Sequence, residues 1–194
     1  MSYTIDHATY RKDATLPLGS GYSARPSGVW PSSIIIHTTN NAKPTTFAFE
    51  AKYLQTSLRV SAHYIIGKAG EIAMILPPTL LAWHAGATLA AWKNARSIGI
   101  EHVVSVGEQW TRVQHAALDS LMMTLLAQHR INSVMVETHR RVAVPGPNIR
   151  KHDPEGWDDA SFYAWRNALG VHTVTAGPHG AIAQEDRRPG ALAA

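Results

Sequence analysis

Three consecutive isoleucines, Ile34 to Ile36, constrain the fold of this chain more than any other feature. They follow Ser33 and lead into His37, without the polar residues that alternate along a half-exposed strand. Such an apolar run predicts a strand that is buried on both faces. The sheet that contains it must therefore be covered by protein on each side.

The rest of the chain supplies elements that could cover such a sheet. Further strands are predicted over residues 60–67, 71–76, 97–106 and 134–136. Helices are predicted over about 45–58, after a capping box at Thr111–Gln114, and after Asp158. On the first helix, Phe49, Tyr53 and Leu54 are predicted to lie near one face.

Length and composition limit the kind of protein and the kind of metal site. A chain of 194 residues with 45% hydrophobic residues is long enough to bury the core of one domain. Cysteine is absent, so a zinc site here could use only histidine and carboxylate ligands, and the chain has 11 histidines. The net charge of +4 comes from scattered basic residues, a pattern that argues against nucleic-acid binding as the main function.

Three regions are predicted along the chain. Residues 1–30 are rich in turns and are expected to form an N-terminal arm, residues 31–170 the main domain, and residues 171–194 a flexible C-terminal tail. The N-terminus lacks the layout of a signal peptide, and no apolar run is long enough to cross a bilayer. We therefore expect a cytoplasmic protein without stable membrane insertion.

Three separated residues could together bind a metal ion. A catalytic zinc ion typically has three protein ligands, and His37, His139 and Asp153 all lie at the ends of predicted strands or in loops. Each residue also has a simpler explanation when taken alone. Either histidine could be a structural residue with a hydrogen-bonded partner, and Asp153 could cap a turn before Pro154.

Glu101 and Lys151 are candidates for chemistry beside such a metal. Glu101 lies inside an apolar strand, where a carboxylate is costly unless it is paired or functional. An ion pair with Arg96 or Arg59 would be the structural alternative. Lys151 precedes Asp153 by two residues and could stabilise an oxyanion, or it could be an ordinary surface charge.

The sequence around these residues resembles a known family. Five segments occur in the family's order: 34–39 (IIIHTT), 60–66 (VSAHYII), 83–86 (WHAG), 97–101 (SIGIE) and 150–154 (RKHDP). They are similar to the zinc-dependent N-acetylmuramoyl-L-alanine amidases, whose fold is shared by T7-type phage lysozyme and peptidoglycan recognition proteins. The resemblance covers roughly residues 30–170. It implies an α+β fold with a central mixed β-sheet flanked by helices.

The resemblance also implies roles for individual residues. His37, His139 and Asp153 would bind Zn²⁺, Glu101 would be the general base, and Lys151 would stabilise the oxyanion. His63, Trp83 and His84 are expected to line or support the substrate cleft, with Tyr64 next to His63. Arg140 and Arg141 lie on a loop that is tethered at both ends to the metal site, so we expect them to face the substrate; the alternative is that they only solvate the loop. For His63 and His84, a purely structural role is the alternative.

Two departures from the family pattern affect the second half of the site. Thr138-His139-Arg140-Arg141 lacks the acidic residue that usually follows the second ligand. The interval from His139 to Asp153 is also longer than usual, with Pro145 to Asn148 as the apparent insertion. If the register differs, His152 would be the alternative ligand.

The implied activity is hydrolysis of the amide between N-acetylmuramic acid and L-alanine in peptidoglycan. Two settings are compatible with the sequence. One, which we favour slightly, is a phage or prophage endolysin, which could reach the cell wall after lysis. The other is a cytosolic amidase that recycles anhydro-muropeptides. A non-catalytic peptidoglycan-binding module is the competing class, but such modules commonly lack a zinc ligand. The expected partner is peptidoglycan or a muropeptide, and the expected oligomeric state is a monomer.

Overall fold

The computed structural model describes residues 3–12, 16–144 and 151–175 of the chain. The strands are β1 (Ile5–Asp6), β2 (Tyr22–Ala24), β3 (Ser33–Ile36), β4 (Tyr64–Ile66), β5 (Ile72–Met74), β6 (Leu80–Ala82), β7 (Ser97–His102) and β8 (Val136–Thr138). The α-helices are α1 (Phe47–Thr56), α2 (Arg112–His129), α3 (His139–Val142) and α4 (Asp159–Thr175). Two short 3₁₀ helices are η1 (Ala90–Trp92) and η2 (Ser133–Met135).

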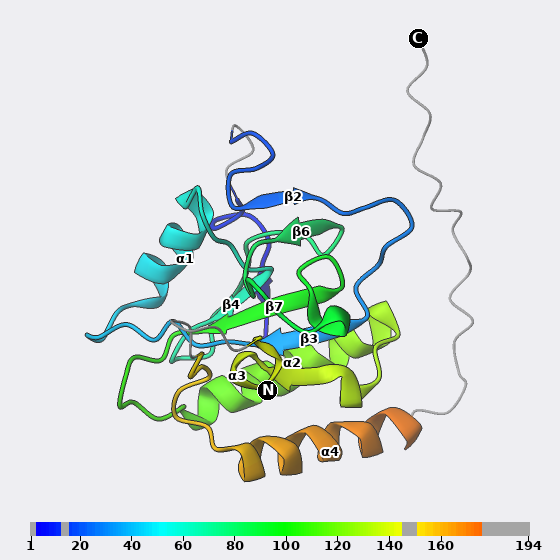
Figure 1. Cartoon of the computed structure of the whole chain (residues 1–194). Helices are drawn as coiled ribbons and strands as arrows, with labels where there is room; N and C mark the ends of the chain where they lie inside the picture. Colours follow the sequence, from blue (N-terminus) through cyan, green and yellow to red (C-terminus); the bar gives the residue numbers. More distant parts are fainter. Residues whose placement is uncertain (1–2, 13–15, 145–150, 176–194) are drawn as a thin grey trace.

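A six-stranded mixed sheet forms the centre of the molecule (Figure 1). Its strand order is β1-β5-β4-β7-β3-β8, and β2 and β6 form a separate antiparallel pair. Strand β5 pairs with β4 in the antiparallel direction. Strands β4, β7, β3 and β8 are parallel to one another. The carboxyl ends of these four strands therefore meet at one edge of the sheet, which is where ligands commonly bind in open α/β sheets.

Helices cover both faces of this sheet, as the apolar run of β3 requires. Ile34 and Ile36 point into the main core with α2 and α4, and the intervening Ile35 packs on the opposite face with Ala85 and Val142. Helix α1 covers part of that second face, where Leu54 packs against β4 and β5. All three isoleucines are fully buried. The predicted α+β class with a central mixed sheet is confirmed.

Helix starts follow from the predicted capping residues. Thr111 accepts a hydrogen bond from the backbone N–H of Gln114, and the Gln114 side chain accepts one from the backbone N–H of Thr111. Thr46 caps α1 by accepting from the N–H of Phe49, and Asp158 accepts from the N–H of Ser161 at the start of α4. These side chains satisfy backbone donors that have no partner within the helix.

Several element boundaries differ from the sequence prediction; β5 and β7, for example, end earlier than predicted, at Met74 and His102. Strand β4 begins at Tyr64 rather than at residue 60, since Val60 belongs to a turn in which the Ser57 hydroxyl accepts hydrogen bonds from the N–H groups of Arg59 and Val60. Strand β8 begins two residues later than predicted, because the Asn132 side chain accepts from Val134 N and starts a 3₁₀ turn. Helix α4 continues to Thr175, into the predicted tail, and the rest of that tail lies outside the described residues.

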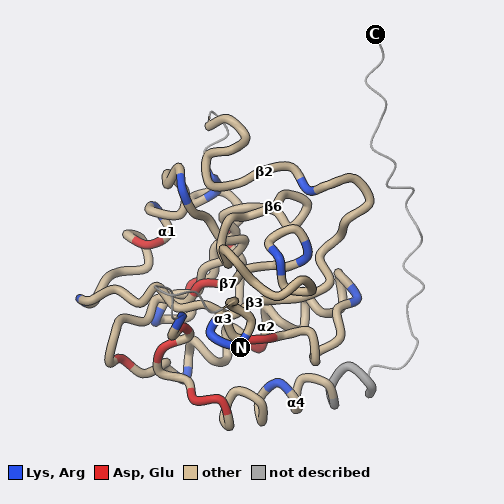
Figure 2. The backbone as a smooth tube through the Cα atoms, viewed as in Figure 1, with Lys and Arg blue, Asp and Glu red and all other residues tan. Residues whose placement is uncertain are grey.

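The predicted N-terminal arm contributes two strands rather than loop alone. Strand β1 pairs in parallel with β5 at the edge of the main sheet, and β2 pairs with β6. The division of the chain at residues 30 and 170 stays a prediction. Among the described residues, lysine and arginine are scattered over the chain rather than gathered in one patch (Figure 2). No helix in that part of the chain combines the length and apolar composition needed to cross a membrane.

Candidate metal centre

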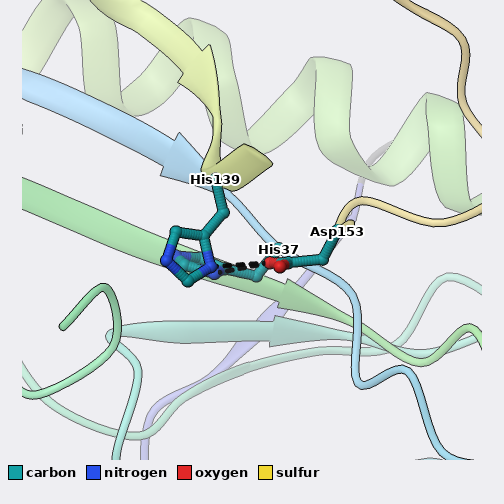
Figure 3. Close-up of side chains that lie close together, drawn as sticks. All are labelled: His37, His139 and Asp153. Carbon is teal, nitrogen blue, oxygen red and sulfur yellow. Dashed lines mark hydrogen bonds and ion pairs between the residues drawn. The ribbon is translucent and has the colours of Figure 1, made fainter. Parts of the chain in front are cut away.

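Three side chains converge at the edge where the parallel strands end. His37 follows β3, His139 follows the neighbouring β8, and Asp153 lies in the segment that leads to α4. Oδ2 of Asp153 is 3.0 Å from Nδ1 of His37 and 2.9 Å from Nδ1 of His139. Figure 3 shows the two rings and the carboxylate pointing toward one another. All three residues are buried, and one ligand atom from each lies within 4.8 Å of the others, so the group could hold a metal ion.

The hydrogen-bond chemistry of this group favours a cation at its centre. Nε2 of His139 is 2.9 Å from the carbonyl oxygen of Ala85, which can only accept, so this nitrogen carries the proton. In a neutral ring the Nδ1 of His139 is then a lone pair that faces the Asp153 carboxylate. Two lone-pair atoms at this distance need a positive charge between them, supplied by a proton or a metal ion. Two imidazoles and a carboxylate suit zinc.

The protonation of the group is consistent with metal binding. Burial, together with the neighbouring His139, lowers the pKa of His37 to about 4, so this ring is neutral near pH 7. Burial alone would raise the pKa of Asp153, but the neighbouring His139 and His37 rings outweigh it and hold that pKa well below its usual value. A neutral imidazole and an ionised carboxylate are the forms that bind metal.

The structure also distinguishes between Asp153 and His152. Asp153 belongs to the converging group, whereas the neighbouring His152 is exposed and lies on the wall of the cleft. The longer interval after His139 therefore still brings the aspartate, and not His152, to His37 and His139. Part of that interval, residues 145–150, lies outside the described residues.

Glu101 faces the same cleft from β7, the strand beside β3. Its Oε2 atom is buried and has no hydrogen-bond partner among the described residues, so the alternative of an ion pair with Arg96 or Arg59 is not observed. Burial and the nearby carboxylates of Asp153 and Glu50 raise the pKa of Glu101 to about 8, although Lys151 opposes this effect. A buried, unpaired carboxyl group with a pKa near neutrality is a candidate for proton transfer.

These residues line a cleft of about 710 Å³. Lys151 is exposed at its rim and also borders a second hollow of about 510 Å³, together with His84 and Val60. The first cleft is lined by His37, Thr38, Thr39, Asn40, Asn41, Phe49, Glu50, Tyr53, Leu54, Val60, Ser61, His84, Glu101, His139, Lys151, His152 and Asp153. All five residues with a predicted metal-binding or catalytic role are therefore in one cavity.

Four of the six residues expected to line or support the cleft are not among the described residues that line it, although the His63 ring packs against that of His84. His63 and Tyr64 are buried; Tyr64 belongs to the main core, and His63 accepts a hydrogen bond from the backbone N–H of Gly99. Arg140 binds Asp159 and the carbonyl oxygens of Pro154 and Trp157, so its charge is used within the protein instead of facing substrate.

Arg141 is the fourth of these residues. It is exposed and donates to the hydroxyl of Tyr163 on α4, and it is not among the described residues that line the cleft. Of the remaining two, His84 lines both hollows and Trp83 lines the second. The expectation that the loop arginines face the substrate is therefore wrong for Arg140 and unsupported by the position of Arg141.

Two residues of α1 form an exposed part of the cleft wall. Phe49, Tyr53 and Leu54, expected near one face, all line the cleft, but Phe49 and Tyr53 are 62% and 51% exposed, whereas Leu54 is buried. Helix α1 packs on the sheet through Ala51 and Leu54. The spacing of four residues between Phe49 and Tyr53 indicates a common stripe, but it does not say whether that stripe faces the core or a cleft.

Comparison with known proteins agrees with this geometry. Residues 27–156 match the family described as N-acetylmuramoyl-L-alanine amidase. A curated relative, the 1,6-anhydro-N-acetylmuramyl-L-alanine amidase AmpD of Salmonella typhimurium (strain SL1344), is 29% identical over 153 residues, covering 69% of this chain and 79% of the relative.

Solved structures show the same fold. The crystal structure of a selenomethionine AmpD derivative matches with a TM-score of 0.58 and 26% identity, covering 79% of this chain and 92% of that one. The catalytic domain of XlyA matches with a TM-score of 0.62 and 25% identity, covering 86% and 99%. Because the family match spans more than half of the chain and includes every residue of the converging group, the chain belongs to the N-acetylmuramoyl-L-alanine amidase family of peptidoglycan hydrolases.

Proposed function

We propose that this amidase is zinc-dependent, with His37, His139 and Asp153 as the metal ligands. The observation that carries the proposal is the convergence of these three ligand atoms in the cleft that also holds the Glu101 carboxyl group. The bond cleaved is the amide between the lactyl group of N-acetylmuramic acid and L-alanine of the stem peptide. A bound zinc ion supplies Lewis acidity and lowers the pKa of water toward neutrality.

Glu101 is the proton carrier of the proposed reaction. Its ionised carboxylate takes a proton from the attacking water and then delivers it to the nitrogen of the departing alanine. A pKa of about 8 in the metal-free protein suits both steps, because the group can change protonation state near neutral pH. In the part of the chain that the structure describes, no protein group binds Oε2, so none would compete with water or substrate for this buried atom.

Lys151 supplies positive charge at the rim of the cleft. Its side chain lines both hollows, so an amide carbonyl that lies between them would be within the field of the ammonium group. An ammonium group there favours the negative oxygen that develops when the carbonyl is attacked. We assign Lys151 this stabilising role, with no part in metal binding.

The substrate setting is favoured by the curated relative. AmpD of Salmonella typhimurium is named for 1,6-anhydro-N-acetylmuramyl-L-alanine, and this chain spans 79% of it. We therefore propose a small anhydro-muropeptide as the preferred substrate. The endolysin setting, expected from the sequence, has the support of a likeness in fold to a Bacillus subtilis endolysin at 23% identity.

One experiment tests both the metal and the substrate. The purified protein is incubated with a soluble anhydro-muropeptide and with intact sacculi, before and after chelator treatment, and products are identified by mass spectrometry. We expect about one zinc ion per chain, release of free stem peptide, loss of activity with chelator and recovery on adding zinc. Protein that carries no zinc and keeps its activity in chelator would refute the metal assignment. Faster cleavage of sacculi than of the muropeptide would favour the endolysin setting.

A further inference from the structure

The loop between β6 and η1 contacts both proposed ligand histidines on the side away from Asp153. Nδ1 of His84 is 3.0 Å from Nε2 of His37, the ring nitrogen that faces away from Asp153. The carbonyl oxygen of the next residue, Ala85, is 2.9 Å from Nε2 of His139, which likewise faces away from Asp153. Two adjacent residues of one loop therefore hold the outer nitrogens of the two histidines.

The contacts of Ser97 indicate the direction of the hydrogen bonds that connect His37, His84 and Ser97. The hydroxyl of Ser97 is 3.0 Å from the carbonyl oxygen of Lys93 and 3.4 Å from that of Trp92, and carbonyls can only accept. We assign the Ser97 hydrogen to the nearer of these acceptors, the carbonyl oxygen of Lys93. The Ser97 oxygen, 3.2 Å from Nε2 of His84, is then the acceptor of the His84 Nε2–H.

This assignment sets the tautomer of His37. A neutral His84 that carries its proton on Nε2 has an unprotonated Nδ1, which accepts from Nε2–H of His37 over 3.0 Å. A neutral His37 ring with its proton on Nε2 then directs the lone pair of its Nδ1 at the metal site, on the side of Asp153.

His139 has the same tautomer, but a backbone carbonyl sets it instead of a histidine side chain. Because the Ala85 carbonyl accepts the proton of Nε2, the Nδ1 atom of His139 also presents a lone pair to Asp153. The Ala85 backbone is itself held in place, since its N–H donates to Oδ1 of Asn94 over 2.9 Å.

The sheet provides a fitted space for the His84 ring. A Cβ atom added at Gly99 would lie 2.5 Å from Cγ and 2.6 Å from Nδ1 of His84, closer than real atoms approach. Gly99 is on β7 between Ser97, which binds His84, and Glu101, which faces the cleft. The absence of a side chain at residue 99 is thus what lets the His84 ring lie against the strand.

We propose that His84, the Ala85 carbonyl and Ser97 form a positioning unit that keeps both histidines as tautomers with unprotonated Nδ1 atoms directed at the metal site. The inference rests on the proposed metal site and adds the residues that orient it. His84 acts through His37 and needs no contact with the metal. Partners of this kind commonly change metal affinity 10- to 100-fold when removed.

Zinc affinity of four variants tests the unit, measured by competition with a chromophoric chelator. His84→Leu removes the acceptor for His37 and should weaken zinc binding by about 10- to 100-fold. His84→Asn can present an amide oxygen near the position of Nδ1 and should recover most of that loss. Ser97→Ala should cause a smaller loss. His115→Leu removes a histidine that stacks on Trp110, outside the cleft, and should bind zinc like the parent.

The tautomers themselves give a second readout that does not need activity. Long-range ¹H–¹⁵N spectra of the zinc-loaded parent should show Nε2 of His37 and Nε2 of His84 protonated, and Nδ1 of His84 unprotonated. A protonated Nδ1 on His84, or unchanged zinc affinity in His84→Leu, would overturn the proposal. If His84→Leu does not fold, the asparagine and Ser97→Ala variants and the parent spectrum still decide. A parent that binds no zinc would instead refute the proposed function, whatever its tautomers.

Discussion

Replacement of Glu101 by glutamine should affect stability and turnover in opposite directions. Glutamine has nearly the same shape as a protonated glutamic acid but cannot ionise or transfer a proton. Because the folded protein raises the pKa of Glu101 to about 8, from the ordinary value of 4.5, folding disfavours its ionised form. Glu101→Gln should therefore stabilise the metal-free protein at alkaline pH while abolishing most of its activity.

The sign and the size of the stability effect follow from the two pKa values. Below pH 4.5 the carboxyl group is protonated in both the folded and the unfolded chain, so it causes no penalty. As the pH rises toward 8, the unfolded chain ionises first and the parent loses stability. Each pKa unit corresponds to about 1.4 kcal/mol, which sets an upper limit of about 5 kcal/mol. Since Glu101 borders an open cleft and is partly screened by water, we expect about 2 kcal/mol.

The assay is urea unfolding of parent and variant at a series of pH values between 4.5 and 8.5, in chelator. The difference in free energy of unfolding should be small at pH 4.5 and should grow in favour of Glu101→Gln up to about pH 8. Glu71→Gln, which removes an exposed carboxylate, should track the parent. A constant difference between Glu101→Gln and the parent over this range would refute the reasoning. The variant should keep its zinc but lose about 10²- to 10⁴-fold in turnover, as removal of a proton carrier does.

Three further predictions concern other parts of the site. Asp153→Asn should lose zinc and activity together, as measured by elemental analysis and product release, and retention of stoichiometric zinc would contradict its assignment as a ligand. Arg140→Ala should lower the free energy of unfolding by about 1 to 3 kcal/mol, because it leaves backbone carbonyls and Asp159 without their donor; an unchanged urea midpoint would count against this. Phe49→Ser should raise KM with zinc content unchanged, whereas Val106→Ser, at an exposed site away from the cleft, should leave KM as in the parent.

The sequence was most informative where one physical cause dominates. The three isoleucines of β3 can be satisfied only by burial on both faces, and the structure buries all of them. The capping box at Thr111 was equally specific, because two side-chain hydrogen bonds depend on residues three apart. Short segments without such a signal, such as the start of β8, were placed less accurately.

The wall of the cleft was harder to predict, because exposure in a cleft and burial in a core require similar side chains. Phe49 and Tyr53 are apolar enough for either, and only the packing of α1 through Ala51 and Leu54 decides between them. Arg140 illustrates the opposite error. A charge beside a ligand was assumed to face substrate, whereas it binds carbonyl groups of the segment that carries Asp153.

The segment Ser97 to Glu101 contributes three residues to the candidate site from a single strand. In a strand, alternate residues point to the same face. Ser97, Gly99 and Glu101 therefore all face the side of the sheet where the His84 loop and the cleft lie. Ser97 lies within hydrogen-bonding distance of His84, Gly99 leaves room for that ring, and Glu101 reaches the cleft with an Oε2 atom that has no partner among the described residues. The intervening Ile98 and Ile100 point to the other face and pack in the core against α2. A shift of one residue in this strand would bury the carboxylate in that core and expose isoleucine to the cleft, so packing of the core and placement of the chemistry are specified by the same register.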